Sequence, residues 1–239
     1  MIQPSKRTIV AMGGNGVEEP YNPLVDDHVL ELARRNRGRE RPRVCFVPTA
    51  SGDSPAYIAA FYAAFARRAE VSHLGLFGRT VVDLERFVLD QDVVYVGGGN
   101  TANMLAVWRV HGLDRILARA WDDGIVLAGT SAGANCWFES SSTDSFGPLA
   151  ALDDGLGFLA GSHSPHYDGE AARRPLFRQL IGQGAMAGGF ASDDGAALVF
   201  RDRDLVEAVA SLPGARSYRV VRGSDGDAIE TELPTRYLG

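Results

Sequence analysis

Residues 125–135 read Ile-Val-Leu-Ala-Gly-Thr-Ser-Ala-Gly-Ala-Asn, an apolar run that ends at a serine flanked by glycines, Ser131. A continuous apolar run of this kind is typical of a strand that is buried on both faces of a parallel sheet. The residues that follow can form a helix, so the serine falls on a tight strand-to-helix turn. This stretch predicts an α/β fold in which the Ser131 hydroxyl stands above the end of a strand.

Further apolar runs on both sides of this stretch extend the pattern. Upstream they occupy residues 8–12, 43–47, 71–77 and 93–96, and they alternate with helix-like segments at 24–37, 55–69, 100–109 and 113–123. Strands and helices that alternate in this way predict a doubly wound, mostly parallel sheet. Shorter runs at 196–200, 205–210 and 218–222 predict a meander that finishes one side of the same domain. Since no linker or repeat interrupts the chain, we expect one domain over residues 1–239.

The composition is that of an ordinary globular protein, with 45% hydrophobic residues and a net charge of −6. An acidic chain of this kind argues against a general nucleic-acid binder. Residues 1–7 contain no signal-peptide core, and no apolar run is long enough to span a bilayer. Cys45 and Cys136 lie in apolar surroundings, which indicates buried, reduced thiols. We therefore expect a cytoplasmic protein that binds neither nucleic acid nor membrane; a homodimer stays open.

Ser131 lies in a G-x-S-x-G pattern, whose small neighbours permit the sharp turn that exposes a nucleophilic hydroxyl. Backbone N–H groups at the start of the next helix favour an incoming oxyanion. A serine that only caps a helix is the alternative. The preceding strand and the two glycines favour the nucleophile.

A nucleophilic serine needs a base, and the segment 161–168 offers two histidines, His163 and His166, in a loop predicted to enter a helix. His166 is favoured, because Pro165 restricts the backbone before it and Tyr167 can pack beside it. The other histidines lie in or at the ends of predicted helices and strands, where structural or surface roles are expected: His28, His73 and His111.

The carboxylate that would orient this base is left open between two positions. Asp144 follows the nucleophile by a short polar stretch, and Asp194 precedes a late strand. Both are acidic residues in predicted loops, where most carboxylates are simply solvated.

Glycine-rich turns end three of the predicted strands, at residues 13–15, 97–100 and 129–131. Ligands of open α/β sheets bind at the carboxyl ends of strands, so we expect the site there. The turn at 97–100 lacks the lysine of a phosphate-binding P-loop. Its N–H groups are better suited to an oxyanion, with Gly98 or Gly99 donating together with Ala132.

Residues 94–101, residues 129–135 and the triplet Pro165-His166-Tyr167 together resemble the peptidase E family of serine peptidases. These are aspartyl dipeptidases related to cyanophycinases, and the resemblance runs from the first predicted strand to about residue 200. It implies a class I glutamine amidotransferase-like fold, a flavodoxin-like three-layer sandwich. It also implies that Ser131 is the nucleophile and His166 the base, with either Asp144 or Asp194 as the acid.

The resemblance further implies hydrolysis of dipeptides with an N-terminal aspartate, without a metal or other cofactor. Such a substrate requires a cationic partner for its side chain, and Arg173 is favoured over its neighbour Arg174. A guanidinium can bind a carboxylate through two parallel hydrogen bonds. The glycine turn with Asn100 is expected to contribute to binding of the oxyanion or the substrate.

Three other functions stay open. A cyanophycinase-like enzyme would cleave β-linked aspartyl-arginine, and a non-catalytic relative would only bind a small ligand. An α/β-hydrolase esterase shares the serine turn, but its histidine normally lies near the C-terminus, and none follows His166 here. A glutamine amidotransferase is disfavoured, because its nucleophile is a cysteine at the turn itself, whereas Cys136 lies five residues further on.

Overall fold

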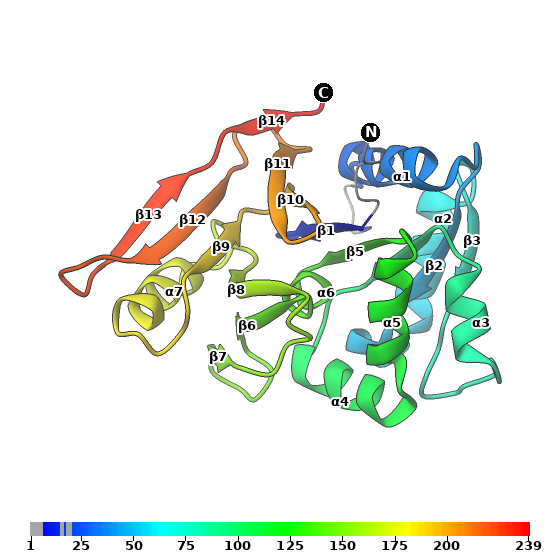
Figure 1. Cartoon of the computed structure of the whole chain (residues 1–239), viewed down its shortest axis with the longest axis horizontal. Coiled ribbons are helices and arrows are strands. Elements are labelled where there is room, and N and C mark those ends of the chain that lie inside the picture. The colour runs from blue at the N-terminus through cyan, green and yellow to red at the C-terminus, as the bar shows by residue number, and fades with distance from the viewer. Residues whose placement is uncertain (1–6, 15–16, 18–20) are drawn as a thin grey trace.

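The computed structural model describes residues 7–14, 17 and 21–239, so Asn15 of the first glycine turn lies outside the described residues. Within them, the larger sheet has eight strands in the order β14-β11-β10-β1-β5-β4-β2-β3 (Figure 1). The run from β1 to β3 is parallel throughout. Its strands are β1 (Thr8–Met12), β5 (Val126–Thr130), β4 (Val93–Val96), β2 (Arg43–Val47) and β3 (Glu70–His73).

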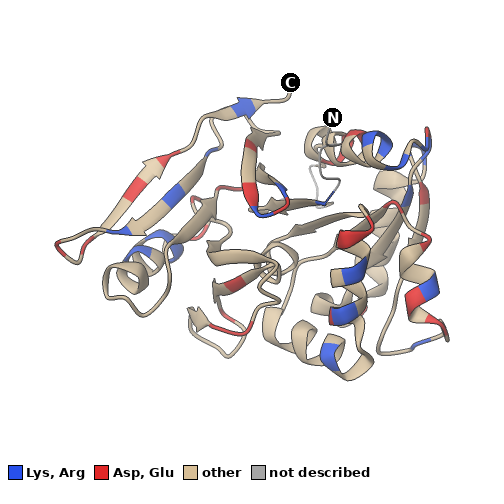
Figure 2. Ribbon diagram, in the orientation of Figure 1, with Lys and Arg blue, Asp and Glu red and all other residues tan. Residues whose placement is uncertain are grey.

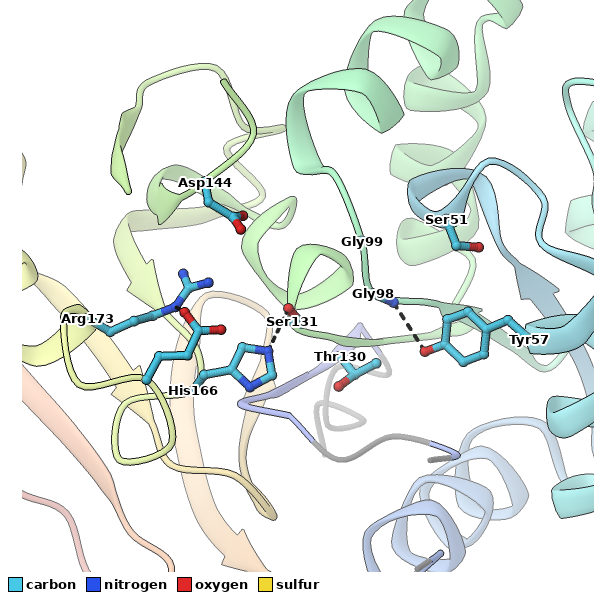
Figure 3. Close-up of a pocket in the computed structure, with 10 residues that line it drawn as sticks. Ser51, Tyr57, Gly98, Gly99, Thr130, Ser131, Asp144, His166 and Arg173 are labelled. Atoms are coloured by element: carbon cyan, nitrogen blue, oxygen red, sulfur yellow. Dashed lines mark hydrogen bonds and ion pairs between the residues drawn. The ribbon is translucent and has the colours of Figure 1, made fainter. Parts of the chain in front are cut away.

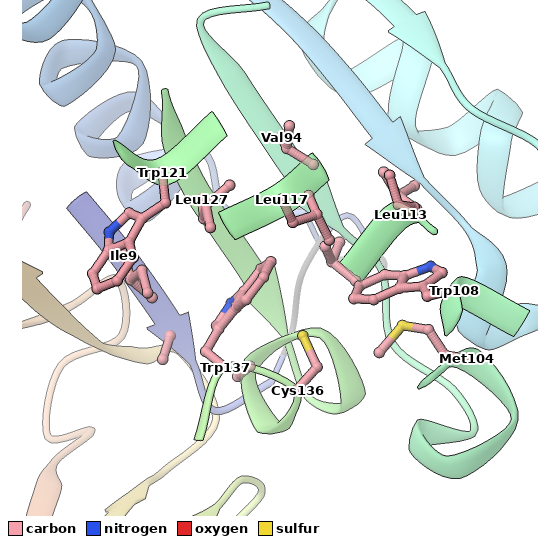
Figure 4. Close-up of a cluster of buried hydrophobic side chains, with 14 of the residues drawn as sticks. Ile9, Val94, Met104, Trp108, Leu113, Leu117, Trp121, Leu127, Cys136 and Trp137 are labelled. Atoms are coloured by element: carbon pink, nitrogen blue, oxygen red, sulfur yellow. The ribbon is translucent and has the colours of Figure 1, made fainter. Parts of the chain in front are cut away.

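Helices cover both faces of this sheet, which confirms the predicted doubly wound α/β architecture. Along β1, Ile9 and Ala11 join one buried cluster, and Val10 and Met12 join another, because successive side chains of a strand point to opposite faces. The first cluster includes residues of α3 (Leu84–Leu89), α4 (Thr101–His111) and α5 (Leu113–Asp122), and the second includes residues of α1 (Leu24–Arg37) and α2 (Pro55–Phe65). Figure 4 shows part of the first cluster, where three indole rings pack: Trp108, Trp121 and Trp137.

The predicted strand over residues 71–77 is wrong in its second half. β3 ends at His73, and the chain then leaves the sheet. Asp53 follows the short helix η1 (Thr49–Ser51), and its carboxylate accepts the N–H groups of Leu76 and Phe77 at 2.6 and 2.8 Å. These two hydrogen bonds hold the segment after β3 in a turn. The predicted helix over 55–69 also ends early, at Phe65, because the chain turns back to enter β3 at Glu70.

A second sheet, with six strands in the described residues, was not predicted. Its order is β13-β12-β9-β8-β6-β7, and α7 (Arg173–Gly182) packs against it. The strands are β6 (Phe138–Thr143), β7 (Ala150–Leu152), β8 (Leu159–Ser164), β9 (Gly189–Ser192), β12 (Ser217–Arg222) and β13 (Ala228–Glu232). β6 and β8 contain buried serines and threonine instead of an apolar alternation, so periodicity gave no signal. The predicted loop around His163 is therefore wrong, since His163 lies in β8.

The predicted meander at the end of the chain is correct for its first two strands, which pair antiparallel, and wrong for the third. β10 (Ala196–Arg201) and β11 (Asp204–Ala210) extend the first sheet beyond β1, and β14 (Thr235–Tyr237) pairs with β11. β12 instead pairs with β9 in the second sheet. The two sheets share a buried cluster that joins Phe138 and Leu159 to Phe200. The extent of one domain over residues 1–239 stays a prediction.

Charged residues follow this layering. Figure 2 shows the inner strands β4 and β5 without charge, whereas α5, α3 and the β12–β13 ribbon carry Lys, Arg, Asp or Glu. A strand covered on both faces has no solvent in which to place a charge. No helix in the described part of the chain is long and apolar enough to cross a membrane.

Candidate active site

Ser131 lies on a strained turn between β5 and the one-turn helix α6 (Ala132–Asn135). Its φ of 54° and ψ of −114° belong to a region that residues with a side chain rarely adopt. The flanking glycines make the turn sterically possible. A β-carbon at Gly129 would lie 2.1 Å from the carbonyl oxygen of Gly133, and one at Gly133 would lie 2.3 Å from that of Val96. The Ser131 N–H donates to the Met12 carbonyl at 3.1 Å and ties the turn to β1.

His166 stands between Ser131 and Asp194. Its Nε2 lies 2.9 Å from Ser131 Oγ, and its Nδ1 lies 2.7 Å from Asp194 Oδ1. The backbone of His166, at φ 49°, is held by an N–H donated to the Gly13 carbonyl. A β-carbon at Gly14 would lie 2.0 Å from Asp194 Oδ1, so only glycine fits beside this pair. The glycine turn after β1 and the serine turn after β5 thus lie side by side, and Ser131, His166 and Asp194 meet there.

Asp144, the other carboxylate left open by the sequence, lies elsewhere in the same cavity. It follows β6 and lines the cavity with Ser131 and His166, but in the described residues no hydrogen bond joins it to His166 (Figure 3). Asp194 is therefore the carboxylate in contact with the imidazole.

His163, the second histidine of the same segment, is fully buried. Its Nδ1 lies 2.9 Å from Asn135 Oδ1, and its ring stacks on Phe138. Burial, with smaller effects of Arg173 and His166, lowers the pKa of His163 to about 3, so its imidazole is neutral near pH 7. His163 packs in the core and does not line the cavity.

The predicted oxyanion donors lie next to Ser131. A β-carbon at Gly98 would come within 3.4 Å of the Ser131 β-carbon, and Gly99 adopts a φ of 135° against the carbonyl of Ala50. The Gly98 N–H donates to the Tyr57 hydroxyl at 3.3 Å in this structure, so this amide already has a partner. The Ala132 N–H opens α6. Since α6 is only four residues long, its dipole contributes little, and the local N–H groups matter more.

The cavity in front of Ser131 has a volume of about 340 Å³. Arg173 enters its wall with only 4% of its surface exposed. Its Nε donates to Glu170 Oε2 at 2.7 Å, and its Nη1 donates to the Ser142 carbonyl at 2.8 Å. The lining also includes residues that the sequence gave no reason to select: Ser51, Tyr57, Thr130 and Glu170.

Two other residues singled out in the sequence, Arg174 and Asn100, lie outside the cavity lining. Arg174 does not line the cavity; it pairs with Glu230 and lies over the rings of Tyr167 and Tyr218. Asn100 does not line the cavity. Its Oδ1 accepts the Asn103 N–H at 2.8 Å and caps α4, and its Nδ2 donates to the Ser145 carbonyl. Asn100 thus has a structural role, since asparagine is a preferred N-cap, and its contact with the substrate stays a prediction.

The model of peptidase family S51 matches residues 9–208. The chain belongs to peptidase family S51. It is 51% identical over 235 residues to the uncharacterized peptidase YgaJ of Bacillus subtilis (strain 168), with 98% of this chain and 100% of YgaJ covered. The predicted resemblance to the peptidase E family is thereby confirmed.

Two solved structures share the fold of this S51 peptidase. A peptidase from an acI-B1 actinobacterium superposes with a TM-score of 0.71 at 17% identity, over 95% of this chain and 94% of that one. A protein of Listeria monocytogenes EGD-e, provisionally named peptidase E, superposes with a TM-score of 0.59 at 18% identity, over 84% and 96%. Such identities establish the fold alone, whereas the family match establishes a peptidase of the serine type.

The two cysteines of this S51 peptidase are expected to be inert in the folded protein. Both are fully buried, and burial raises the pKa of the Cys45 thiol to about 12 and that of Cys136 well above its usual value. Because the thiolate is the reactive form, iodoacetamide at pH 7.5 should modify neither cysteine and leave peptidase activity unchanged. Peptide mass spectrometry with a parallel activity assay checks this. Rapid inactivation with alkylation of Cys136 would instead indicate a cysteine nucleophile.

Proposed function

We propose that this S51 peptidase is an aspartyl dipeptidase, which hydrolyses Asp-Xaa dipeptides through Ser131, His166 and Asp194. The observation that carries the proposal is the unbroken row of hydrogen bonds from Ser131 Oγ through the imidazole to Asp194. This row opens into the same cavity as the buried guanidinium of Arg173. A nucleophile with its base and a cation for the substrate side chain therefore share one small site.

In the first half of the reaction, His166 Nε2 takes the proton of Ser131 as Oγ attacks the carbonyl carbon of the aspartyl residue. Asp194 accepts the Nδ1–H, which fixes the tautomer and stabilises the imidazolium. The N–H of Ala132 would donate to the oxyanion, together with that of Gly98 once it exchanges the Tyr57 hydroxyl for the substrate oxygen. When the tetrahedral intermediate collapses, the C–N bond breaks and the imidazolium gives its proton to the leaving amine.

In the second half, water replaces the departed amine. His166 Nε2 takes a proton from this water, whose oxygen attacks the ester carbonyl of the acyl-enzyme. The ester C–O bond then breaks, and the imidazolium returns the proton to Ser131 Oγ. The products are free aspartate and the released amino acid, and the enzyme is back in its starting state.

The charges of the cavity support an N-terminal aspartate as the acyl residue. Arg173 uses Nε and Nη1 within the protein, and among the described residues its Nη2 has no hydrogen-bond partner, so it can bind a carboxylate of the substrate. Asp144 and Glu170 line the same cavity and offer negative charge to a free α-ammonium group. An aspartyl residue with a free amino group carries both complementary charges, whereas a residue inside a longer chain lacks the ammonium.

Replacing Arg173 with glutamine should lower kcat/KM for Asp-Leu by about 10²- to 10³-fold, because a desolvated charge pair contributes about 2–5 kcal/mol. Activity on Ala-Leu, which has no side-chain carboxylate, should stay unchanged. Arg174→Gln is the matched control, since its guanidinium faces Glu230 outside the cavity. Equal losses on both dipeptides in Arg173→Gln would show that the arginine serves the fold and not the specificity.

The cyanophycinase-like alternative has one observation in its favour. The carboxylates of Asp144 and Glu170 also suit the guanidinium of a β-linked aspartyl-arginine dipeptide. Hydrolysis of Asp-Leu, Glu-Leu, Ala-Leu and β-Asp-Arg by one enzyme preparation separates the two functions. A kcat/KM for Asp-Leu far above those for the other three dipeptides supports the aspartyl dipeptidase, and a kcat/KM for β-Asp-Arg far above the others supports the alternative.

A further inference from the structure

The carboxylate partner of His166 is held by a second aspartate that the proposed reaction does not use. Asp168 Oδ1 accepts the backbone N–H of Asp194 at 2.8 Å. Asp168 lies two residues after His166, so one short segment supplies both the imidazole and this contact. Two hydrogen bonds thus join the His166–Asp168 segment to Asp194. One links the imidazole of His166 to the Asp194 carboxylate, and the other links the Asp168 carboxylate to the Asp194 backbone N–H.

The surroundings of Asp194 explain why such a contact matters. Asp194 sits in the turn between β9 and β10, and the residue before it is anchored separately, because Asp193 exchanges backbone and side-chain hydrogen bonds with Arg216. Within the described residues, the backbone N–H of Asp194 has Asp168 as its partner. Without that partner, the turn would keep Asp193 in place while Asp194 could rotate away from the imidazole.

Close packing leaves little tolerance for such a rotation. A β-carbon at Gly14 would lie 2.0 Å from Asp194 Oδ1, and one at Gly169 would lie 2.5 Å from Oδ2. The backbone of both glycines therefore lies close to the carboxylate, with no room for a side chain, and a small shift of the Asp194 main chain moves the carboxylate relative to His166 Nδ1. A misplacement of about 1 Å in a catalytic group can cost about 100-fold in rate.

We infer that Asp168 is a positioning residue, which sets the carboxylate of Asp194 against His166 by holding the Asp194 main chain. The inference rests on the proposed function, since it requires that Asp194 serves the reaction. Asp168 itself does not line the cavity. Its contribution is expected in kcat and not in substrate binding.

Kinetics of three variants on Asp-Leu test this role. Asp168→Ala should lower kcat about 10- to 100-fold with KM within about twofold of wild type. Asp168→Asn keeps a side-chain oxygen that can accept the Asp194 N–H, so it should recover most of the lost kcat. Asp225→Ala is the matched control: Asp225 accepts the Asp227 N–H in the exposed β12–β13 turn, far along the second sheet, and its loss should leave kcat unchanged.

A spectroscopic readout separates positioning from a general loss of structure. The hydrogen-bonded Nδ1–H proton of His166 should give a low-field ¹H NMR signal in wild type and in Asp168→Asn, and this signal should weaken or move in Asp168→Ala. A wild-type kcat and signal in Asp168→Ala would overturn the inference if Asp194→Asn is inactive. Full activity of Asp194→Asn would overturn the inference together with the proposed triad.

Discussion

Alanine in place of Ser131 should lower kcat/KM for Asp-Leu by about 10⁴-fold or more, because the oxygen that forms the acyl-enzyme is gone. The φ of 54° at this position is one that alanine adopts only under strain, as serine does, so the turn itself should persist. What activity remains comes from the oxyanion donors and from binding of the dipeptide. The measurement is dipeptide hydrolysis by purified protein, with free amino acids quantified against a no-enzyme blank.

Circular dichroism and thermal unfolding of Ser131→Ala provide the control for this result. If Ser131→Ala has the spectrum and unfolding temperature of wild type but no activity, the loss is due to the missing nucleophile and not to unfolding. Ser145→Ala is a comparison from a nearby serine that bonds Thr143 and the N–H of Ala102 but does not line the cavity. Equal activity in wild type and Ser131→Ala would remove Ser131 from the reaction altogether.

The second large effect is expected at Asp194, where asparagine should lower kcat by about 10⁴-fold with little change in KM. The carboxylate accepts the Nδ1–H of His166 at 2.7 Å and so keeps Nε2 free to take the serine proton. An amide can instead donate to Nδ1, which stabilises the tautomer that carries its proton on Nε2. Kinetics on Asp-Leu at saturating and limiting concentrations separate kcat from KM.

Asp144→Asn is the matched variant for this prediction, since it changes a carboxylate of the same cavity by the same chemical step. Asp144 has no bond to His166 in the described structure and is exposed, so we expect KM to rise about two- to fivefold with kcat preserved. The reverse pattern, with kcat lost in Asp144→Asn and kept in Asp194→Asn, would show that Asp144 and not Asp194 is the acid of the triad.

The parallel half of the fold could be predicted from the sequence, because its strands are buried on both faces and read as continuous apolar runs. The serine turn could also be predicted, because a β-carbon at Gly129 or Gly133 would lie only 2.1 or 2.3 Å from a carbonyl oxygen, and this steric constraint leaves a recognisable pattern of small residues. These local constraints are visible in a single chain.

The second sheet could not be predicted, because two of its strands bury polar side chains instead of apolar ones. β6 and β8 bury serines that hydrogen-bond inside the fold, as in the 2.8 Å bond between Ser142 Oγ and Ser164 Oγ, so these strands carry no apolar alternation. Because Asp194 follows a strand of that sheet, its distance from His166 depends on a part of the fold that was not predicted. The sequence therefore left Asp144 and Asp194 open.

The arginine and the asparagine show two further limits of sequence interpretation. Arg173 faces the cavity and Arg174 does not, which depends on where α7 begins and how it is rotated. Asn100 follows three glycines at the end of a strand, a position that suits a ligand contact, but it also precedes a helix, where its N-cap geometry is the stronger local preference.

Covalent labelling by a fluorophosphonate, located by peptide mass spectrometry, tests the central claim most directly. Such a reagent forms a stable phosphonyl ester with a serine that an adjacent base activates. The account predicts a single adduct on Ser131, matched by loss of Asp-Leu hydrolysis, and strongly slowed labelling in His166→Ala. An adduct on another residue, or full activity of protein labelled at Ser131, would contradict it.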